Sequence, residues 1–450
     1  MEIDLPGVSA LTPASLDSYN PLVCRGAEPF FYDRDGTLLA GDEGSKPQEE
    51  FSMAIPTAER MKRIGTETAF AVSLEASELA RQGKKIYPFH LGDMNIPTPP
   101  NVMEAAIDAM KKGKTGYCPT AGIPELREAL AKDVGASRHL NLAAGNVAIQ
   151  PGGKPAIGKF ILAAMNPGDR VLYPNPGYPI YESQIDFHGG IGMPYGYREG
   201  RDNFILDMKT IRQSIQEGAR ILIYNNYQNP TGASSPKEEM EELASLAVNN
   251  DLIVLADEAY FDIRYSGEPL SIASFPGMAE RTVILYTFSK KFAMTGWRLG
   301  AAVGPAKFIE AIAKINVNDE SCSNHFVQYG ALAGLRGTLE GPDRILSTLR
   351  ERRDVLVGLL NTIPGIRCFK PEATFYLFPN VTEAMKRKGI QEVEAFRRAC
   401  LETTGVSFCT RRHFGRPLPG ETEQYIRFAY SGIDLAEIKE GMAQMADFLG

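Results

Sequence analysis

Short apolar runs alternate with amphipathic stretches through the middle of this chain, from about residue 100 to 340. The runs have the length of buried strands, and the stretches between them carry apolar residues at helical spacing. Such alternation predicts an α/β fold in which helices cover both faces of a mostly parallel sheet. The expected strands are Arg170–Tyr173, Ile221–Tyr224, Leu252–Leu255, Val283–Tyr286 and Leu299–Val303.

The pattern changes after about residue 345. A long charged helix over Leu346–Leu360 leads into the apolar segments Phe375–Phe378 and Ile426–Ala429, and a last helix ends near Leu449. This part of the chain predicts a second, smaller α/β domain. The length of 450 residues agrees with two or three domains.

Composition excludes several classes of function. The formal charge is −7 and no lysine- and arginine-rich run is present, which argues against nucleic-acid binding. No apolar run approaches the eighteen or so residues that a membrane-spanning helix needs. The six cysteines and five histidines are scattered, which indicates neither a disulfide framework nor a metal site. We expect a reduced, cytoplasmic compartment.

The richest chemistry follows the expected strand Val283–Tyr286. The sequence there is Tyr286-Thr-Phe-Ser-Lys-Lys-Phe-Ala-Met-Thr-Gly-Trp-Arg-Leu-Gly300, and we expect Thr287–Ser289 to form a turn. A lysine amine can form a Schiff base with an aldehyde cofactor, while arginine and hydroxyl groups bind a phosphate. The segment resembles the Schiff-base lysine motif of fold-type I aminotransferases of class I/II, which are aspartate/aromatic aminotransferase-like enzymes dependent on pyridoxal 5'-phosphate (PLP). Lys290 has the spacing of that motif, and Lys291 misses it by one residue.

Two further motifs follow strands upstream. Asn229-Pro-Thr-Gly232 by itself is a good turn, and Asp257-Glu-Ala-Tyr260 by itself is a strand-end acid. A buried carboxylate is costly unless it meets a positive partner. The resemblance implies that Asp257 pairs with the protonated pyridine nitrogen of PLP, and that Asn229 and Tyr260 donate to its ring oxygen.

A third motif suits a phosphate. After the strand-like Val147–Gln150, Gly152 and Gly153 turn the chain into an apolar helix from Ala156 to Met165, and free N–H groups at a helix start bind anions. The resemblance implies that the phosphate lies among the backbone of Gly153 and Lys154 and the side chains of Thr287, Ser289 and Arg298. It also implies that Tyr178 stacks on the pyridine ring, although a core tyrosine is the alternative.

Substrate binding has several candidates. The resemblance implies that Arg427 grips the α-carboxylate, with Asn229 beside it and Gly92 in the loop that closes on the substrate. Lys154 follows the two glycines, where one aminotransferase subgroup has a lysine for the distal carboxylate of acidic substrates. Aspartate and glutamate are therefore favoured, with a surface lysine as the alternative.

Two segments depart from the family pattern. Asp93, Met94, Asn95 and Ile96 replace the usual loop residues after Gly92, and Thr410-Arg-Arg-His-Phe-Gly415 replaces the usual Pro-Gly-Ser-x-Phe-Gly. The charges of Arg411, Arg412 and His413 either recognise a second acidic group or are solvated loop charges.

The resemblance covers the chain from about Glu59 to the end and implies a domain plan. Residues 100–345 would form the large PLP-binding domain, and residues 56–99 and 346–450 the small domain. Tyr117 would reach the phosphate of a neighbouring subunit, which implies a homodimer with its sites at the interface. Residues 1–55 are an N-terminal extension, in which Phe30, Phe31 and Tyr32 suggest an arm that packs on the partner subunit.

The implied activity is amino transfer between an L-amino acid and a 2-oxo acid by a ping-pong mechanism, with Lys290 moving the proton. A PLP-dependent lyase, decarboxylase or oxidase on the same fold is the first alternative, and a non-catalytic PLP-binding regulator is a remote one. Asp33-x-Asp35-Gly matches the nucleophile motif of haloacid-dehalogenase phosphatases, but a hairpin turn explains it better.

Overall fold

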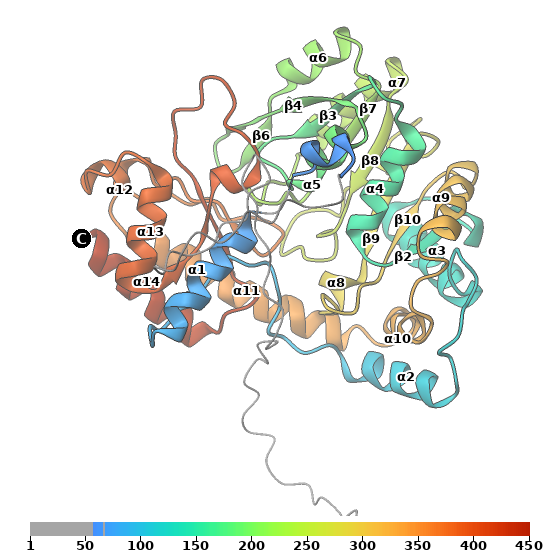
Figure 1. The fold of residues 1–450 in the computed structure, drawn as a ribbon, viewed down its shortest axis with the longest axis horizontal. Coiled ribbons are helices and arrows are strands. Elements are labelled where there is room, and N and C mark those ends of the chain that lie inside the picture. Colours follow the sequence, from blue (N-terminus) through green and yellow to red (C-terminus); the bar gives the residue numbers. More distant parts are fainter. Residues whose placement is uncertain (1–56, 66–67) are drawn as a thin grey trace, which may run out of the picture. The chain divides into compact units, whose positions relative to one another are not determined.

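The computed structural model describes residues 57–65 and 68–450, and the compact unit within them is Ala58–Gly450 (Figure 1). The expectations for the N-terminal extension, including its hairpin and its arm, lie outside the described residues. None of the helices in the described ranges is long and apolar enough to cross a membrane.

Among the described residues, seven strands form one large sheet. Their spatial order is β2 (Val147–Gln150), β10 (Gly300–Val303), β9 (Thr282–Thr287), β8 (Ile253–Asp257), β7 (Ile221–Tyr224), β3 (Arg170–Pro174) and β4 (Ile191–Tyr195). From β9 to β4 all neighbours are parallel, and β10 pairs antiparallel with both β9 and β2. The expected mostly parallel sheet is confirmed, and the strand expected at Leu299–Val303 is the one that runs in the opposite direction.

Helices cover both faces of this sheet, as alternating side chains on each strand require. In β9, Val283 and Leu285 pack into one hydrophobic cluster, while Ile284 and Tyr286 pack into another. The first cluster includes side chains from α4 (Gly153–Ala164), α5 (Ile180–Phe187) and α9 (Ala306–Asp319). The second includes α2 (Pro100–Lys111), α3 (Pro124–Arg138), α6 (Met208–Gln216), α7 (Lys237–Asn249) and α10 (His325–Arg336).

A smaller α/β layer is drawn mostly in orange and red in Figure 1, because most of it comes from residues 340–450. Its strands are β11 (Tyr376–Leu377), β14 (Ile426–Ala429) and β13 (Cys409–Thr410) in one sheet, with β1 (Tyr87–Pro88) parallel to β12 (Val406–Ser407) in another. A third hydrophobic cluster joins β1, β11, β12 and β14 to α11 (Glu340–Leu360), α12 (Thr382–Arg387), α13 (Val393–Thr404) and α14 (Leu435–Leu449). Tyr260 and Tyr265, which follow β8, also pack into this cluster.

The strand directions determine which residues meet. The carboxyl ends of β2, β7, β8 and β9 lie at one edge of the large sheet, because these strands all run the same way. The antiparallel β10 begins at that edge, so Arg298, just before Gly300, is carried to it as well. Open α/β sheets bind their ligands at this edge.

Candidate active site

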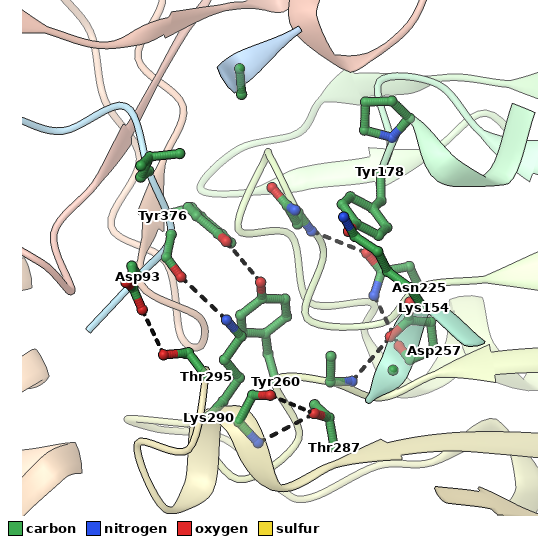
Figure 2. A pocket seen from close by; sticks show the side chains of 18 of the residues that line it. Asp93, Lys154, Tyr178, Asn225, Asp257, Tyr260, Thr287, Lys290, Thr295 and Tyr376 are labelled. Carbon is green, nitrogen blue, oxygen red and sulfur yellow. Dashed lines mark hydrogen bonds between the residues drawn. The ribbon is translucent and has the colours of Figure 1, made fainter. Parts of the chain in front are cut away.

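One cavity of about 420 Å³ lies at this edge and is drawn from close by in Figure 2. Twelve of the thirteen residues that the sequence singled out for cofactor or substrate line it: Gly92, Gly153, Lys154, Tyr178, Asn229, Asp257, Tyr260, Thr287, Ser289, Lys290, Arg298 and Arg427. The exception is Tyr117, which is 88% exposed and lines a neighbouring cavity together with Arg298.

Lys290 reaches the cavity from α8 (Phe288–Lys291). The turn expected at Thr287–Ser289 is therefore wrong, because β9 continues to Thr287 and a helical turn begins at once. The Oγ1 of Thr287 caps this turn by accepting from the backbone N–H of Ser289 at 3.2 Å. Lys290 Nζ donates to the carbonyl oxygen of Gly92 at 3.2 Å (Figure 2). It lies 5.1 Å from the ring centre of Phe375.

The neighbouring Lys291 points elsewhere. Its Nζ pairs with Asp133 Oδ1 at 3.1 Å and Asp262 Oδ1 at 3.3 Å, and it does not line the cavity. Two adjacent lysines thus have separate environments, and of the two only Lys290 lines the cavity.

The two glycines and Arg298 form a cradle. Gly152 has φ +113° and precedes α4, whose first residue is Gly153. A Cβ on Gly152 would lie 2.2 Å from Arg298 Nη2, so only glycine lets the guanidinium approach the helix start this closely. The hydroxyls of Thr287 and Ser289, 3.0 Å apart, complete the wall. Helix amides, hydroxyls and a guanidinium are the donors that a phosphate requires.

Asp257 ends β8 in a buried position, where the phenol of Tyr181 donates to its Oδ2 at 2.6 Å and the N–H of Ala259 donates to its Oδ1 at 3.1 Å. Burial is the main cause that raises the pKa of the Asp257 carboxyl to about 6. A nearby cation would favour its ionised form, and this is the environment that a protonated pyridine nitrogen would meet.

Asn229 and Arg427 interact directly. Arg427 Nη1 donates to Asn229 Oδ1 at 3.1 Å, so the Asn229 Nδ2 is the side-chain atom oriented to donate to a ring oxygen. Arg427 lies on β14 and is 4% exposed. Its Nη2 donates to the carbonyl of His90 at 2.6 Å, and its Nε makes no hydrogen bond within the described residues. A buried guanidinium with an unused N–H suits a carboxylate ligand.

Tyr178 and Lys154 stand on the opposite wall. The Tyr178 ring packs edge-on against Tyr181 with centroids 5.8 Å apart, and Lys154 Nζ lies 5.8 Å from the centre of the Tyr178 ring and 5.9 Å from that of Phe70. Tyr178 lines the cavity and is partly exposed, and it also packs against the hydrophobic cluster on this face of the sheet, so stacking on a cofactor ring and a core position both stay open.

The three unusual charges of the 410–415 loop separate in space. Arg411 is buried and pairs with Glu421 at 2.7 Å, so it is neither solvated nor in the cavity. Arg412 is an outward charge paired with Glu392 at 2.9 Å. His413 alone of the three lines the cavity, and burial lowers its pKa.

Sequence reasoning missed several contributors. Asn225 donates from Nδ2 to the Asp257 carbonyl at 2.9 Å and accepts from the Asn229 N–H at 3.1 Å; its place directly after β7 was a usable signal. Tyr181 and Tyr376 carried no such signal, because aromatic residues in a helix and a strand are typical of a hydrophobic core.

The donor set fits PLP. The cradle at Gly152 and Arg298 suits its phosphate, and Asp257 suits its ring nitrogen. Lys290 suits its aldehyde, since its side chain lines the same cavity as the cradle and Arg427. No rearrangement of the chain is needed to bring these groups together.

Comparison with known proteins gives the same result. A sequence model of the family "Aminotransferase class I and II" matches residues 85–444. An aspartate aminotransferase of Musicola paradisiaca is 31% identical over 83% of this chain and 92% of its own, and an asparagine–oxo-acid transaminase of Streptococcus mutans is 30% identical over 87% and 98%. The structure of Thermus thermophilus aspartate aminotransferase with maleate superposes with a TM-score of 0.80 at 30% identity, covering 87% of this chain and 99% of that one. The chain belongs to the class I and II aminotransferases and is a PLP-dependent transaminase of fold type I.

Proposed function

We propose that this enzyme transfers the amino group of an acidic L-amino acid, aspartate or glutamate, to a 2-oxo acid. The substrate class is inferred from two cations, Arg427 and Lys154, which line opposite walls of the same cavity. One carboxylate of an acidic substrate would bind Arg427, and the other would reach Lys154. The relatives named aspartate aminotransferase and the maleate, a dicarboxylate, in the Thermus enzyme support this substrate class.

We propose a role for each of these side chains that its position in the cavity supports. Bound PLP supplies the electron sink that makes the Cα–H bond of the substrate breakable. Lys290 Nζ would take the Cα proton as general base and return a proton to a carbon atom of the cofactor. The Asp257 carboxylate holds the proton on the ring nitrogen, and Tyr260 and Asn229 donate to the ring oxygen. Arg427 orients the substrate through its α-carboxylate, and the same anchor serves the 2-oxo acid of the second half-reaction.

We also propose the domain plan and the homodimer that the sequence suggested. Two hydrophobic clusters lie within residues 100–345, and a third is built mainly from residues 56–99 and 346–450, which supports this division, although Tyr260 and Tyr265 of the large part also pack into the third cluster. Met103, Ile107 and Met110 form an exposed apolar stripe on α2, and the exposed Tyr117 follows it. A partner subunit that covers this stripe would receive Tyr117 at its own site. A reduced, cytoplasmic compartment remains the expectation from the scattered cysteines.

The substrate class is tested with Lys154→Ala. A charge-assisted hydrogen bond contributes about 1.5–3 kcal/mol, so KM for aspartate should rise about 10- to 100-fold while KM for alanine stays nearly constant. Lys307→Ala is the matched control, because Lys307 is also the second residue of an exposed helix start and lies outside the cavity. An equal loss with alanine and aspartate, or no loss with either, would show that Lys154 does not bind a distal carboxylate.

A further inference from the structure

Two tyrosine hydroxyls meet at the bottom of the cavity. Tyr260 Oη and Tyr376 Oη are 2.8 Å apart (Figure 2), and both residues are buried, with 6% and 3% exposed. Tyr260 follows β8 of the large sheet, whereas Tyr376 opens β11 of the smaller one. The contact therefore joins the two sheets at the reactive end of the cavity.

The backbone of Gly92 lies so close to Tyr376 that only a residue without a side chain fits there. A Cβ on Gly92 would lie 2.3 Å from Tyr376 Oη and 3.1 Å from its Cζ. The carbonyl of the same glycine accepts from Lys290 Nζ. Gly92 thus leaves room for the Tyr376 hydroxyl next to the reactive amine, a function of this glycine that is distinct from closing on the substrate.

A count of protons gives the hydrogen bond its direction. A phenol has one proton to donate and lone pairs to accept with. If Tyr260 donates its proton to the ring oxygen of PLP, its own oxygen must accept from Tyr376. We propose that Tyr376 is a positioning residue whose hydroxyl donates to Tyr260 and so directs the Tyr260 proton toward the cofactor. This inference rests on the proposed role of Tyr260.

The ring of Tyr376 has a separate contact. The Arg427 guanidinium carbon lies 4.5 Å from the centre of the Tyr376 ring, within the range of a cation–π interaction. The substitution Tyr376→Phe keeps this ring and its packing against Tyr260. It therefore removes the hydroxyl while leaving the support of Arg427 in place.

The test is an absorbance titration of the PLP-loaded enzyme without any amino acid. A donor to the cofactor's ring oxygen stabilises its anionic form, so a weakened donor should move the pH midpoint of the visible absorbance change upward. One neutral hydrogen bond corresponds to about half a pH unit, and we expect that shift in Tyr376→Phe. In a Tyr260→Phe background, Tyr376→Phe should add no further shift, because its effect passes through Tyr260.

The chain offers a matched control. Tyr265 and Tyr430 form a second buried pair with hydroxyls 3.1 Å apart, and neither lines the cavity. Tyr265→Phe removes a buried phenol from a tyrosine pair in the same hydrophobic cluster and should leave the midpoint unchanged.

A second variant tests the same contact from the other side. Gly92→Ala would displace the Tyr376 hydroxyl, so it should raise the midpoint as Tyr376→Phe does. Combining Gly92→Ala with Tyr376→Phe removes the colliding oxygen, and the pair should shift the midpoint no further than Tyr376→Phe alone.

The outcomes separate this inference from the proposed function. An unchanged midpoint in Tyr376→Phe, or a shift that persists in the Tyr260→Phe background, would overturn the role of Tyr376 while leaving transamination of acidic substrates intact. A wild-type enzyme that binds PLP but does not convert aspartate would overturn the substrate proposal and leave this titration valid. A wild-type enzyme with no visible band would overturn both.

Discussion

The buried Asp257 should make the PLP-free enzyme less stable as the pH rises. Its carboxyl is 5% exposed and its hydrogen bonds come from a phenol and a backbone N–H, neither of which is a cation. Burial raises its pKa from the ordinary value of 3.8 to about 6. Replacing it by asparagine removes the charge and keeps the side-chain shape.

The sign follows from proton binding. Below pH 3.8 the carboxyl is neutral in both the folded and the unfolded chain, so it has no pH-dependent effect. Between pH 3.8 and about 6 the folded chain holds more protons than the unfolded chain, so the free energy of unfolding falls as the pH rises. About one pH unit above this pKa the loss is complete and amounts to about 3 kcal/mol, at about 1.4 kcal/mol for each pH unit of displacement.

Urea unfolding of the PLP-free wild type and of Asp257→Asn, at one protein concentration and several pH values, measures this effect. The free energy of unfolding of the variant, measured relative to that of the wild type, should increase by about 1.4 kcal/mol from pH 5 to pH 8. Any hydrogen bond lost on substitution lowers the free energy of unfolding of the variant equally at pH 5 and at pH 8, so it does not change this difference. Adding PLP should remove the wild-type loss, because the ring nitrogen supplies the missing cation. Parallel pH curves for the two PLP-free proteins would refute the reasoning.

The adjacent acid provides the contrast. Glu258 is also buried, but its Oε2 pairs with Arg138 Nε at 2.9 Å, and the Arg138 guanidinium lies 3.5 Å from the centre of the Phe261 ring. Glu258→Gln leaves that guanidinium without its counter-charge and should destabilise the protein by about 3–5 kcal/mol. At pH 8, Asp257→Asn and Glu258→Gln are thus expected to change the free energy of unfolding in opposite directions.

Two further substitutions test the site. Lys290→Ala should lower kcat at least about 100-fold and abolish the visible band of the bound cofactor. Lys291→Ala should keep the rate and the band, and its lost ion pairs should lower the free energy of unfolding by about 1 kcal/mol. Absorbance spectra and rates of the two variants test this, and equal losses in both would contradict the assignment of Lys290. Arg427→Lys should raise KM about 10- to 100-fold for alanine and aspartate alike, because lysine cannot bind a carboxylate through two parallel N–H groups. A loss confined to aspartate would instead place Arg427 at the distal carboxylate.

The sequence located most of the cavity because the chemistry follows the strands. Asn229, Asp257 and Lys290 come soon after apolar runs, and parallel strands bring their carboxyl ends to one edge. The same logic could have found Asn225. It could not place the expected turn at Thr287–Ser289 correctly, because a threonine side chain that caps a helical turn reads much like a turn residue.

The loop at residues 410–415 shows where local sequence stops being informative. Arg411, Arg412 and His413 are consecutive, yet Arg411 pairs with Glu421, Arg412 pairs with Glu392 and His413 lines the cavity. Their directions depend on Glu421 and Glu392, which lie in other parts of the chain. No spacing rule within the loop distinguishes them.

By itself, the sequence determined the alternation of strands and helices, the residues at the strand ends and the family. These depend on side-chain periodicity and on short-range spacing, which are written directly in the chain. The tertiary structure decided which acids pair with the second lysine, Lys291, that β10 reverses and carries Arg298 to the cradle at Gly152, and that Tyr376 reaches Tyr260 past Gly92. Those contacts join segments up to several hundred residues apart, so they exist only once the sheets have packed and each buried polar group has met its partner.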